Sequence, residues 1–154
     1  MWQNRKLDVI TVSNVALAST NPAKKTKLVV IIARSHPGES PTSFIAQGFI
    51  DFLVSTHAMM GALRDHVMIK IIPMMNPDGV FLGNYRCSLM GYDLNRHWNQ
   101  VSPWSHPTLH AIKNFLLEMD ASKTLELDMV IDMHAHSSLM GTFIYGNSYD
   151  DVYR

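Results

Sequence analysis

The sequence has 154 residues, of which 47% are hydrophobic and 17% charged, and its formal net charge at pH 7 is zero. These values are ordinary for one globular domain, and a neutral chain has no broad electrostatic field to attract nucleic acid or an anionic membrane. A single cysteine, Cys87, excludes an internal disulfide and is typical of a reducing compartment. No apolar run approaches the ~20 residues of a membrane span and the start has no signal-peptide core, so we expect a cytoplasmic protein.

The first part of the chain contains two strand-like runs and a helix. Residues 7–12 alternate between apolar and polar, and residues 28–33 form a continuous apolar run that is typical of a strand covered on both faces. Ser40 and Pro41 are suited to the N-cap and the first position of a helix. This helix is expected to end near His57 and to bury one apolar face, which consists of Phe44, Ile45, Phe49, Phe52 and Leu53.

The second part of the chain continues the alternation. A second buried strand is predicted over residues 67–74, followed by a turn at 76–79. Residues 80–104 have little periodicity and many Gly, Asn and Arg residues, which indicates a long functional loop. A helix is predicted over 106–120, a third buried strand over 127–133 and a fourth strand over 142–145.

Strands that alternate with helices predict a three-layer α/β/α fold with a mostly parallel, mixed sheet. Ligands of such sheets bind beyond the carboxyl ends of the strands. His36, Glu39, Asn76 and His134 all follow predicted strand ends closely. We therefore expect these four side chains to lie along one edge of the sheet.

Three of these residues are candidate metal ligands. His36 and Glu39 are three positions apart on a turn that contains Pro-Gly, and His134 follows a distant strand. Three protein ligands leave one coordination position for water, which is the arrangement of a catalytic zinc site. Two alternatives stay open: in one, Glu39 simply flanks the helix that begins after Ser40, and in the other, His136 is the ligand instead of His134.

The long loop contains two candidate substrate-binding arginines, Arg86 and Arg96, the second of which follows Asn95. A guanidinium group is suited to bidentate binding of a carboxylate and to stabilising an oxyanion. The alternative interpretation is that both arginines are solvated surface residues.

Five short segments occur in a fixed order: SHPGE at 35–39, NPDG at 76–79, GNYRCS at 83–88, GYDLNR at 91–96 and DMHAHS at 132–137. Together they resemble the zinc metallocarboxypeptidases, specifically the cytosolic carboxypeptidase subfamily that removes glutamates from tubulin. The resemblance covers residues 28–146 and implies a zinc-carboxypeptidase-like fold with one Zn²⁺ ion. It implies that the zinc ligands are His36, Glu39 and His134. It also implies that Arg86 polarises the scissile carbonyl, while Asn95 and Arg96 hold the terminal carboxylate of the substrate.

The resemblance is incomplete at both ends. The family's general-base glutamate lies well downstream of the third ligand, whereas Glu118 and Glu126 precede His134 and do not match that position. The family's amino-terminal β-sandwich domain is not found either. We therefore expect residues 1–154 to be the N-terminal part of a catalytic domain that is incomplete at its C-terminus.

The function that the resemblance implies is hydrolysis by a metal-dependent protease, with removal of glutamate from acidic protein tails. Tubulin is the expected partner, in the cytosol and in association with microtubules or cilia. Two alternatives remain. One is a related zinc amidohydrolase that acts on a small acylated amino acid, and the other is a non-catalytic module that binds zinc and acidic tails.

Overall fold

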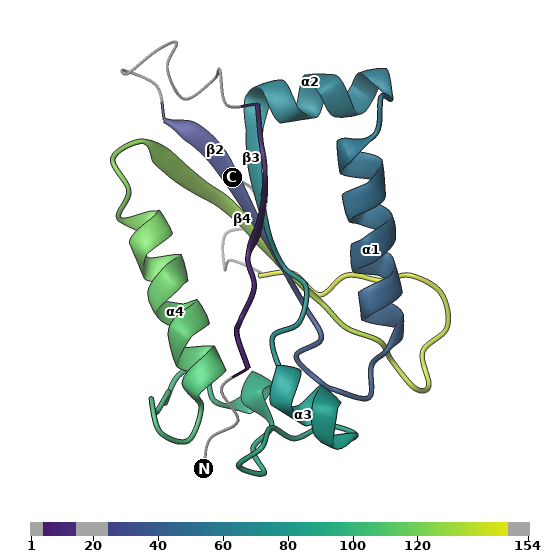
Figure 1. Cartoon of the computed structure of the whole chain (residues 1–154), viewed down its shortest axis with the longest axis vertical. Coiled ribbons are helices and arrows are strands. Elements are labelled where there is room, and N and C mark those ends of the chain that lie inside the picture. The colour runs from purple at the N-terminus through teal and green to yellow at the C-terminus, as the bar shows by residue number, and fades with distance from the viewer. Residues whose placement is uncertain (1–4, 15–24, 148–154) are drawn as a thin grey trace.

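Strands and helices alternate along the chain, as the apolar pattern predicts (Figure 1). The computed structural model describes residues 5–14 and 25–147. The strands are β1 (Ile10–Val12), β2 (Thr26–Ala33), β3 (Val67–Ile72) and β4 (Leu125–Met133). The helices are α1 (Pro41–Val54), α2 (Ala58–His66), α3 (Pro77–Leu82) and α4 (Pro107–Asp120), with a short 3-10 helix at Leu94–Arg96.

Within the described residues, the four strands form one sheet with the order β1-β3-β2-β4. β2 pairs in parallel with both of its neighbours, whereas β1 runs antiparallel to β3. Ala33 at the end of β2 pairs with Met133 at the end of β4. Residues that follow these two strands therefore lie at the same edge of the sheet, and the predicted mixed, mostly parallel sheet is confirmed.

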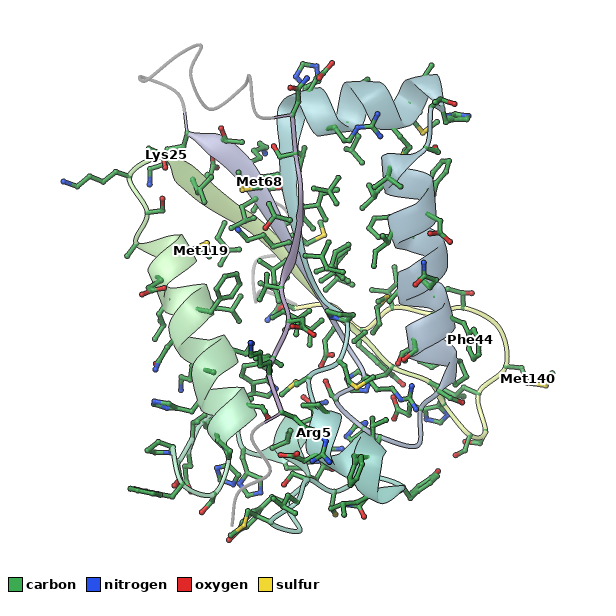
Figure 2. All side chains as sticks on the ribbon, in the orientation of Figure 1. Arg5, Lys25, Phe44, Met68, Met119 and Met140 are labelled. Carbon is green, nitrogen blue, oxygen red and sulfur yellow. The ribbon has the colours of Figure 1, made fainter. Side chains whose placement is uncertain are left out.

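Helices cover both faces of the sheet, which confirms the predicted three-layer α/β/α fold. α4 lies on one face, and α1 and α2 lie on the other (Figure 1). Met68 and Met119 pack into the layer between the sheet and α4 (Figure 2). No helix in residues 5–14 or 25–147 has the length and apolar character needed to cross a bilayer. The buried residues of the α4 layer include Leu28, Val30, Ile32, Ile72, Leu109 and Ile112, and those of the opposite layer are Val12, Ile31, Leu53, Met60, Ile69 and Ile71.

The predicted helix after Ser40 is present as α1, but much of its predicted buried face is wrong. Phe44 is 78% exposed, and Ile45 and Phe52 are also exposed, whereas Leu53 is fully buried. Apolar residues occur on several sides of this helix, so the pattern does not define its orientation. The side that faces the sheet is set by a stripe with steps of three and four residues, which contains Thr42, Ala46, Phe49 and Leu53.

Helix α2 is not predicted by the apolar pattern. It begins after His57, whose side chain accepts a hydrogen bond from Met59 N at 3.3 Å, and α1 already ends at Val54. Of its nine residues only Met60 is buried. A helix that buries so little leaves a weak periodic signal in the sequence.

The predicted turn at 76–79 is instead the start of α3. Asn76 Oδ1 accepts a hydrogen bond from Gly79 N at 3.1 Å and caps this helix, with Pro77 in its first turn. The side chain of Asn76 is buried and its Nδ2 donates to Ser35 O at 3.3 Å. Asn76 therefore lies near the expected edge of the sheet, where its side-chain amide forms hydrogen bonds with the backbone of residues 35 and 79.

The last two strand predictions need correction. Residues 142–145 form no strand, and Phe143, Ile144 and Tyr145 are exposed. β4 is present, but Met129 and Val130 are more than 40% exposed rather than buried. Within the described residues β4 pairs only with β2, so its outer edge lacks the neighbours that would cover these side chains.

Candidate metal centre

The turn after β2 holds the first two candidate ligands. Arg34 adopts the left-handed conformation with φ 59°, which redirects the chain immediately after Ala33. Its Nε donates to Pro37 O at 2.9 Å, and Glu39 N donates to His36 O at 3.1 Å. His36 and Glu39 are therefore held on one closed turn at the carboxyl end of β2.

Two glycines bring the segment that contains Arg86 against this turn. A β-carbon at Gly38 would lie 2.6 Å from Tyr85 O, and one at Gly79 would lie 2.5 Å from Pro37 Cγ. Gly38 N also donates to Tyr85 O at 2.7 Å. Since both approaches leave no space for a side chain, these two positions require glycine, and Arg86 follows Tyr85 directly beside the turn.

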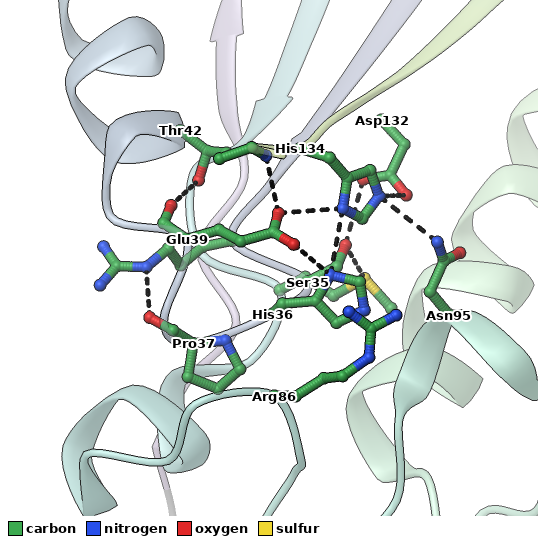
Figure 3. Close-up of polar contacts among 12 residues, drawn as sticks. Ser35, His36, Pro37, Glu39, Thr42, Arg86, Asn95, Asp132 and His134 are labelled. Atoms are coloured by element: carbon green, nitrogen blue, oxygen red, sulfur yellow. Dashed lines mark hydrogen bonds and ion pairs between the residues drawn. The ribbon is translucent and has the colours of Figure 1, made fainter. Parts of the chain in front are cut away.

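His36, Glu39 and His134 converge on one point (Figure 3). His36 Nδ1 lies 2.8 Å from Glu39 Oε1, and His134 Nδ1 lies 3.1 Å from Glu39 Oε2. The two Nδ1 atoms are 3.2 Å apart. Residues 98 positions apart in the sequence thus meet because β2 and β4 are parallel neighbours that end together.

The outer nitrogens of both imidazole rings contact carboxylates. His36 Nε2 lies 3.0 Å from Asp93 Oδ1, and His134 Nε2 lies 2.7 Å from Asp132 Oδ2. A carboxylate only accepts hydrogen bonds, so both of these contacts are satisfied by the tautomer that is protonated at Nε2 and has its lone pair on Nδ1. Two nitrogen lone pairs and the Glu39 carboxylate therefore face one another.

In this tautomer no hydrogen lies between the three groups, so the chemistry of the donor set fits a metal ion. Tetrahedral zinc with bonds of about 2.0–2.1 Å holds neighbouring donors about 3.3–3.4 Å apart. The two Nδ1 atoms are 3.2 Å apart, slightly closer than that spacing, and they lie 2.8 and 3.1 Å from the two different oxygens of Glu39. Ala135 N also donates to Glu39 Oε2 at 2.9 Å, which orients the carboxylate.

The surrounding charges shift two pKa values. The hydrogen bond with Asp132 is the main cause that raises the pKa of His134, burial opposes this shift, and Glu39 adds to it. Burial tends to raise the pKa of Asp93, but hydrogen bonds from Arg86 and His36 outweigh it, so this pKa is lowered. Asp93 is therefore a carboxylate at neutral pH, and it acts as the common acceptor for both neighbours.

Arg86 and Asn95 lie next to the candidate metal ligands. Arg86 Nε donates to Asp93 Oδ2 at 2.6 Å, and its guanidinium lies beside the His36 ring (Figure 3). Asn95 Nδ2 lies 3.4 Å from His134 Nε2, and its Oδ1 accepts from Trp98 Nε1 at 2.9 Å. The loop therefore places one guanidinium and one amide next to the candidate ligands.

Arg96 and His136 lie apart from this group. Arg96 is exposed, and its Nη1 donates to the adjacent Asn95 O at 3.3 Å. His136 is also exposed, and its Nδ1 accepts from Ser138 N at 3.2 Å and Leu139 N at 2.9 Å. Among the described residues, the group of ligand atoms within 4.8 Å of one another contains His134 and not His136.

Asp93 and Asp132 are not among the site residues predicted from the sequence. Asp132 lies on β4 and His134 directly follows the last residue of that strand, so a carboxylate two positions before the histidine, close enough to contact it, is a usable signal. Asp93 gives a weaker signal, because an aspartate at this position is already explained by helix capping. Its side chain caps the 3-10 helix by accepting from Asn95 N at 3.0 Å. Its contact with His36 joins residues 57 positions apart and depends on the path of the loop.

Three rings pack together beside Asn95. The His97 and His106 rings are 4.4 Å apart and nearly parallel, and the Tyr92 ring packs edge-on against His106 at 4.7 Å. His106 is 4% exposed and its Nδ1 accepts from Ser102 N at 3.1 Å. Its Nε2 is buried without a hydrogen-bond partner among the described residues, so the neutral ring is favoured there.

This ring stack predicts a pH-dependent stability. Burial is the main cause that lowers the pKa of His106, and the charge of His97 adds to it. The unfolded chain then binds a proton at His106 that the folded chain excludes, so the contribution of His106 to the free energy of unfolding should fall as pH drops below about 6.5. We expect His106→Asn to reduce this pH dependence in urea unfolding between pH 7.5 and 5.5. His110→Asn, one turn further along α4, serves as the control, and equal pH dependence in wild type and His106→Asn would contradict the assignment.

Sequence comparison agrees with this geometry. The family model described as zinc carboxypeptidase matches residues 2–153 of the chain. The chain belongs to the zinc carboxypeptidase family. It is 50% identical to cytosolic carboxypeptidase 6 of Mus musculus and 51% identical to that of Homo sapiens, over 152 residues in each case. The resemblance to zinc metallocarboxypeptidases in the sequence analysis is thereby confirmed.

The carboxypeptidase relatives are longer than this chain. The two alignments cover 99% of this chain but only 28% of the mouse protein and 30% of the human protein. A solved structure of a metallo-carboxypeptidase from Burkholderia cenocepacia matches 88% of this chain and 34% of that one, with 29% identity and a TM-score of 0.75. The carboxypeptidase fold is therefore shared over most of the chain, and the chain spans about a third or less of these relatives.

Proposed function

We propose that residues 1–154 form the N-terminal part of a zinc carboxypeptidase catalytic domain, with one zinc ion held by His36, Glu39 and His134. The observation that carries the proposal is the convergence of two Nδ1 atoms and one carboxylate at the ends of two parallel strands. When bound at such a site, zinc polarises a carbonyl group and lowers the pKa of a bound water to about 7.

Arg86 is the residue proposed to stabilise the substrate carbonyl. Asp93 accepts from its Nε and so fixes the direction of the guanidinium beside the metal-binding residues. A fixed positive group at this position stabilises the negative charge that develops on the carbonyl oxygen during attack by water. The ion pair with Asp93 keeps the group in place before substrate binds.

Asn95 and Arg96 are proposed to hold the terminal carboxylate of the substrate. The bond from Trp98 to Asn95 Oδ1 directs the amide NH₂ group of Asn95 toward His134. Arg96 is exposed, so its planar fork is accessible to a carboxylate. Recognition of a free terminal carboxylate restricts cleavage to the last residue of a chain, which is carboxypeptidase action.

The proposed substrates are acidic protein tails from which glutamate is removed, with tubulin as the proposed partner. The sequence identity to proteins named cytosolic carboxypeptidases supports this proposal, and their name supports a cytosolic site of action. The more specific location that we propose is association with microtubules or cilia. Since the chain has no net charge, attraction of an acidic tail must come from local groups such as Arg86 and Arg96.

The carboxylate-binding role of Arg96 is tested with a glutamate-ended peptide and the zinc-loaded chain. Arg96→Ala should weaken binding about tenfold or more, since a hydrogen bond to a charged group contributes about 1.5–3 kcal/mol. Arg96→Lys retains the charge but loses the fork, so its binding should also be weaker than wild type. Isothermal titration calorimetry measures both effects.

A peptide with an amidated carboxyl terminus provides the matched ligand. Amidation should weaken wild-type binding about as much as Arg96→Ala does. The effects of the two changes should not add, because both remove the same contact between Arg96 and the terminal carboxylate. Lys25→Ala removes a positive charge just before β2, at the opposite end of the strand from His36, and should leave binding unchanged. Equal binding of free and amidated peptides would refute carboxypeptidase recognition and indicate a general binder of acidic tails.

A further inference from the structure

One carboxylate lies behind the candidate ligand His134 and also contacts the residue that precedes His36. Asp132 Oδ2 lies 2.7 Å from His134 Nε2, and Asp132 Oδ1 accepts from Ser35 Oγ at 3.1 Å (Figure 3). Ser35 directly precedes His36 and is 1% exposed. The contacts therefore run from the residue before one candidate ligand, through Asp132, to another candidate ligand.

The sheet register explains why these groups meet. Asp132 lies on β4 and His134 directly follows the last residue of that strand, where its Nε2 contacts the Asp132 carboxylate. Ile32 of β2 pairs with Asp132 and Ala33 pairs with Met133, which brings Ser35 to the same edge. The two strands that carry the ligands are thus joined by side chains as well as by backbone pairing.

The Ser35 hydroxyl has one proton and two neighbouring acceptors. Its Oγ lies 3.1 Å from both Met75 Sδ and Asp132 Oδ1. An ionised carboxylate is a much stronger acceptor than a thioether, so the proton is directed to Asp132. This bond holds one oxygen of Asp132 and leaves the other to accept from His134.

We propose that Asp132 is a positioning residue for His134 and that Ser35 acts through Asp132. When Asp132 accepts a hydrogen bond from Nε2–H, it fixes the tautomer in which Nδ1 carries the lone pair. The negative charge of the carboxylate also makes that lone pair a stronger donor to a metal ion. The inference rests on the proposed metal site, because His134 needs a fixed tautomer only as a ligand. Asp93 has the corresponding contact with His36, so each imidazole of the site has its own carboxylate.

Zinc affinity of the purified 154-residue chain tests this role. Asp132→Ala should weaken zinc binding about 10–100-fold, the usual effect of losing a carboxylate partner of a ligating histidine. Asp132→Asn keeps the shape and an acceptor but not the charge, so its zinc affinity should lie between those of wild type and Asp132→Ala. Competition with a chromophoric chelator gives the dissociation constants, and the visible absorption of the Co²⁺-loaded chain reports the ligand geometry.

The matched control is Asp128→Ala. Asp128 lies on the same strand, carries the same charge and pairs with Lys27 at 2.7 Å, away from the ligand atoms. This variant should bind zinc with wild-type affinity and should leave the Co²⁺ spectrum unchanged. A role of Asp132 in stability alone predicts no change in the Co²⁺ spectrum of folded, loaded Asp132→Ala.

Ser35→Ala supplies an independent test that does not remove the carboxylate. It should weaken zinc binding less than Asp132→Ala does, and the double variant should bind no more weakly than Asp132→Ala alone. If Asp132→Ala does not fold, Asp132→Asn and Ser35→Ala decide the question in the same assays.

The outcomes separate this inference from the function on which it rests. If the wild-type chain binds no zinc, the proposed metal site itself is refuted. If the wild type binds zinc and the Asp132 variants bind it equally well with the same Co²⁺ spectrum, only the positioning role is refuted.

Discussion

The wild-type chain is expected to bind about one zinc ion per molecule, and His36→Ala and His134→Ala should each abolish stoichiometric binding. Each variant removes one of three donors and leaves the Glu39 carboxylate with a single imidazole. Two ligands do not complete the three-residue set of a catalytic zinc site. Equilibrium dialysis followed by elemental analysis measures the zinc content directly.

His110→Ala and His136→Ala are the controls for these two variants. His110 lies on α4 and contacts Asn114, and His136 binds backbone groups of residues 138 and 139, so zinc content should stay at the wild-type value. Loss of zinc in His136→Ala together with full retention in His134→Ala would show that the wrong histidine has been chosen. Zinc affinity should also decrease as the pH is lowered, because protons compete with zinc for the same Nδ1 atoms. The raised pKa of His134 strengthens that competition.

The part of the structure that the sequence predicts well is the part with strong local signals. The apolar run before Ser35 defines β2, and the following Pro-Gly pair marks the turn that brings His36 and Glu39 together. The position of His134 follows from the end of β4, because parallel strands place their carboxyl ends at one edge. These features depend on residues close in sequence and on a general rule of parallel sheets.

The features that the sequence does not predict depend on long-range packing. The exposed side of α1 contains Phe44 and Ile45, which are as apolar as the residues that face the sheet, so composition alone does not orient the helix. The contact of Asp93 with His36 depends on a loop whose path is set by the ring stack around His106. Apolar residues at 142–145 resemble a strand, but within the described residues no neighbouring strand pairs with them.

The buried face of α1 has a measurable effect on the stability of the chain. Leu53 is fully buried among Ile31, Ile69 and Ile71 in the layer between α1 and the sheet. Leu53→Ala should lower the free energy of unfolding by about 2–5 kcal/mol, because it removes buried methyl groups and leaves a cavity. This is a large part of the about 5–15 kcal/mol that stabilises a typical domain.

Phe44→Ala is the matched variant on the same helix, since the change removes a larger side chain from a position that is 78% exposed. With little surface removed from water in the folded chain, the expected change is within about 0.5 kcal/mol. Urea unfolding followed by circular dichroism compares both variants with wild type, and their midpoints are compared at equal slope. If Phe44→Ala destabilises the chain as much as Leu53→Ala does, α1 presents to the sheet the face that the sequence pattern predicts. If Leu53→Ala alone is strongly destabilising, the stripe of Thr42, Ala46, Phe49 and Leu53 is the buried face, and α1 stabilises the strand that positions His36.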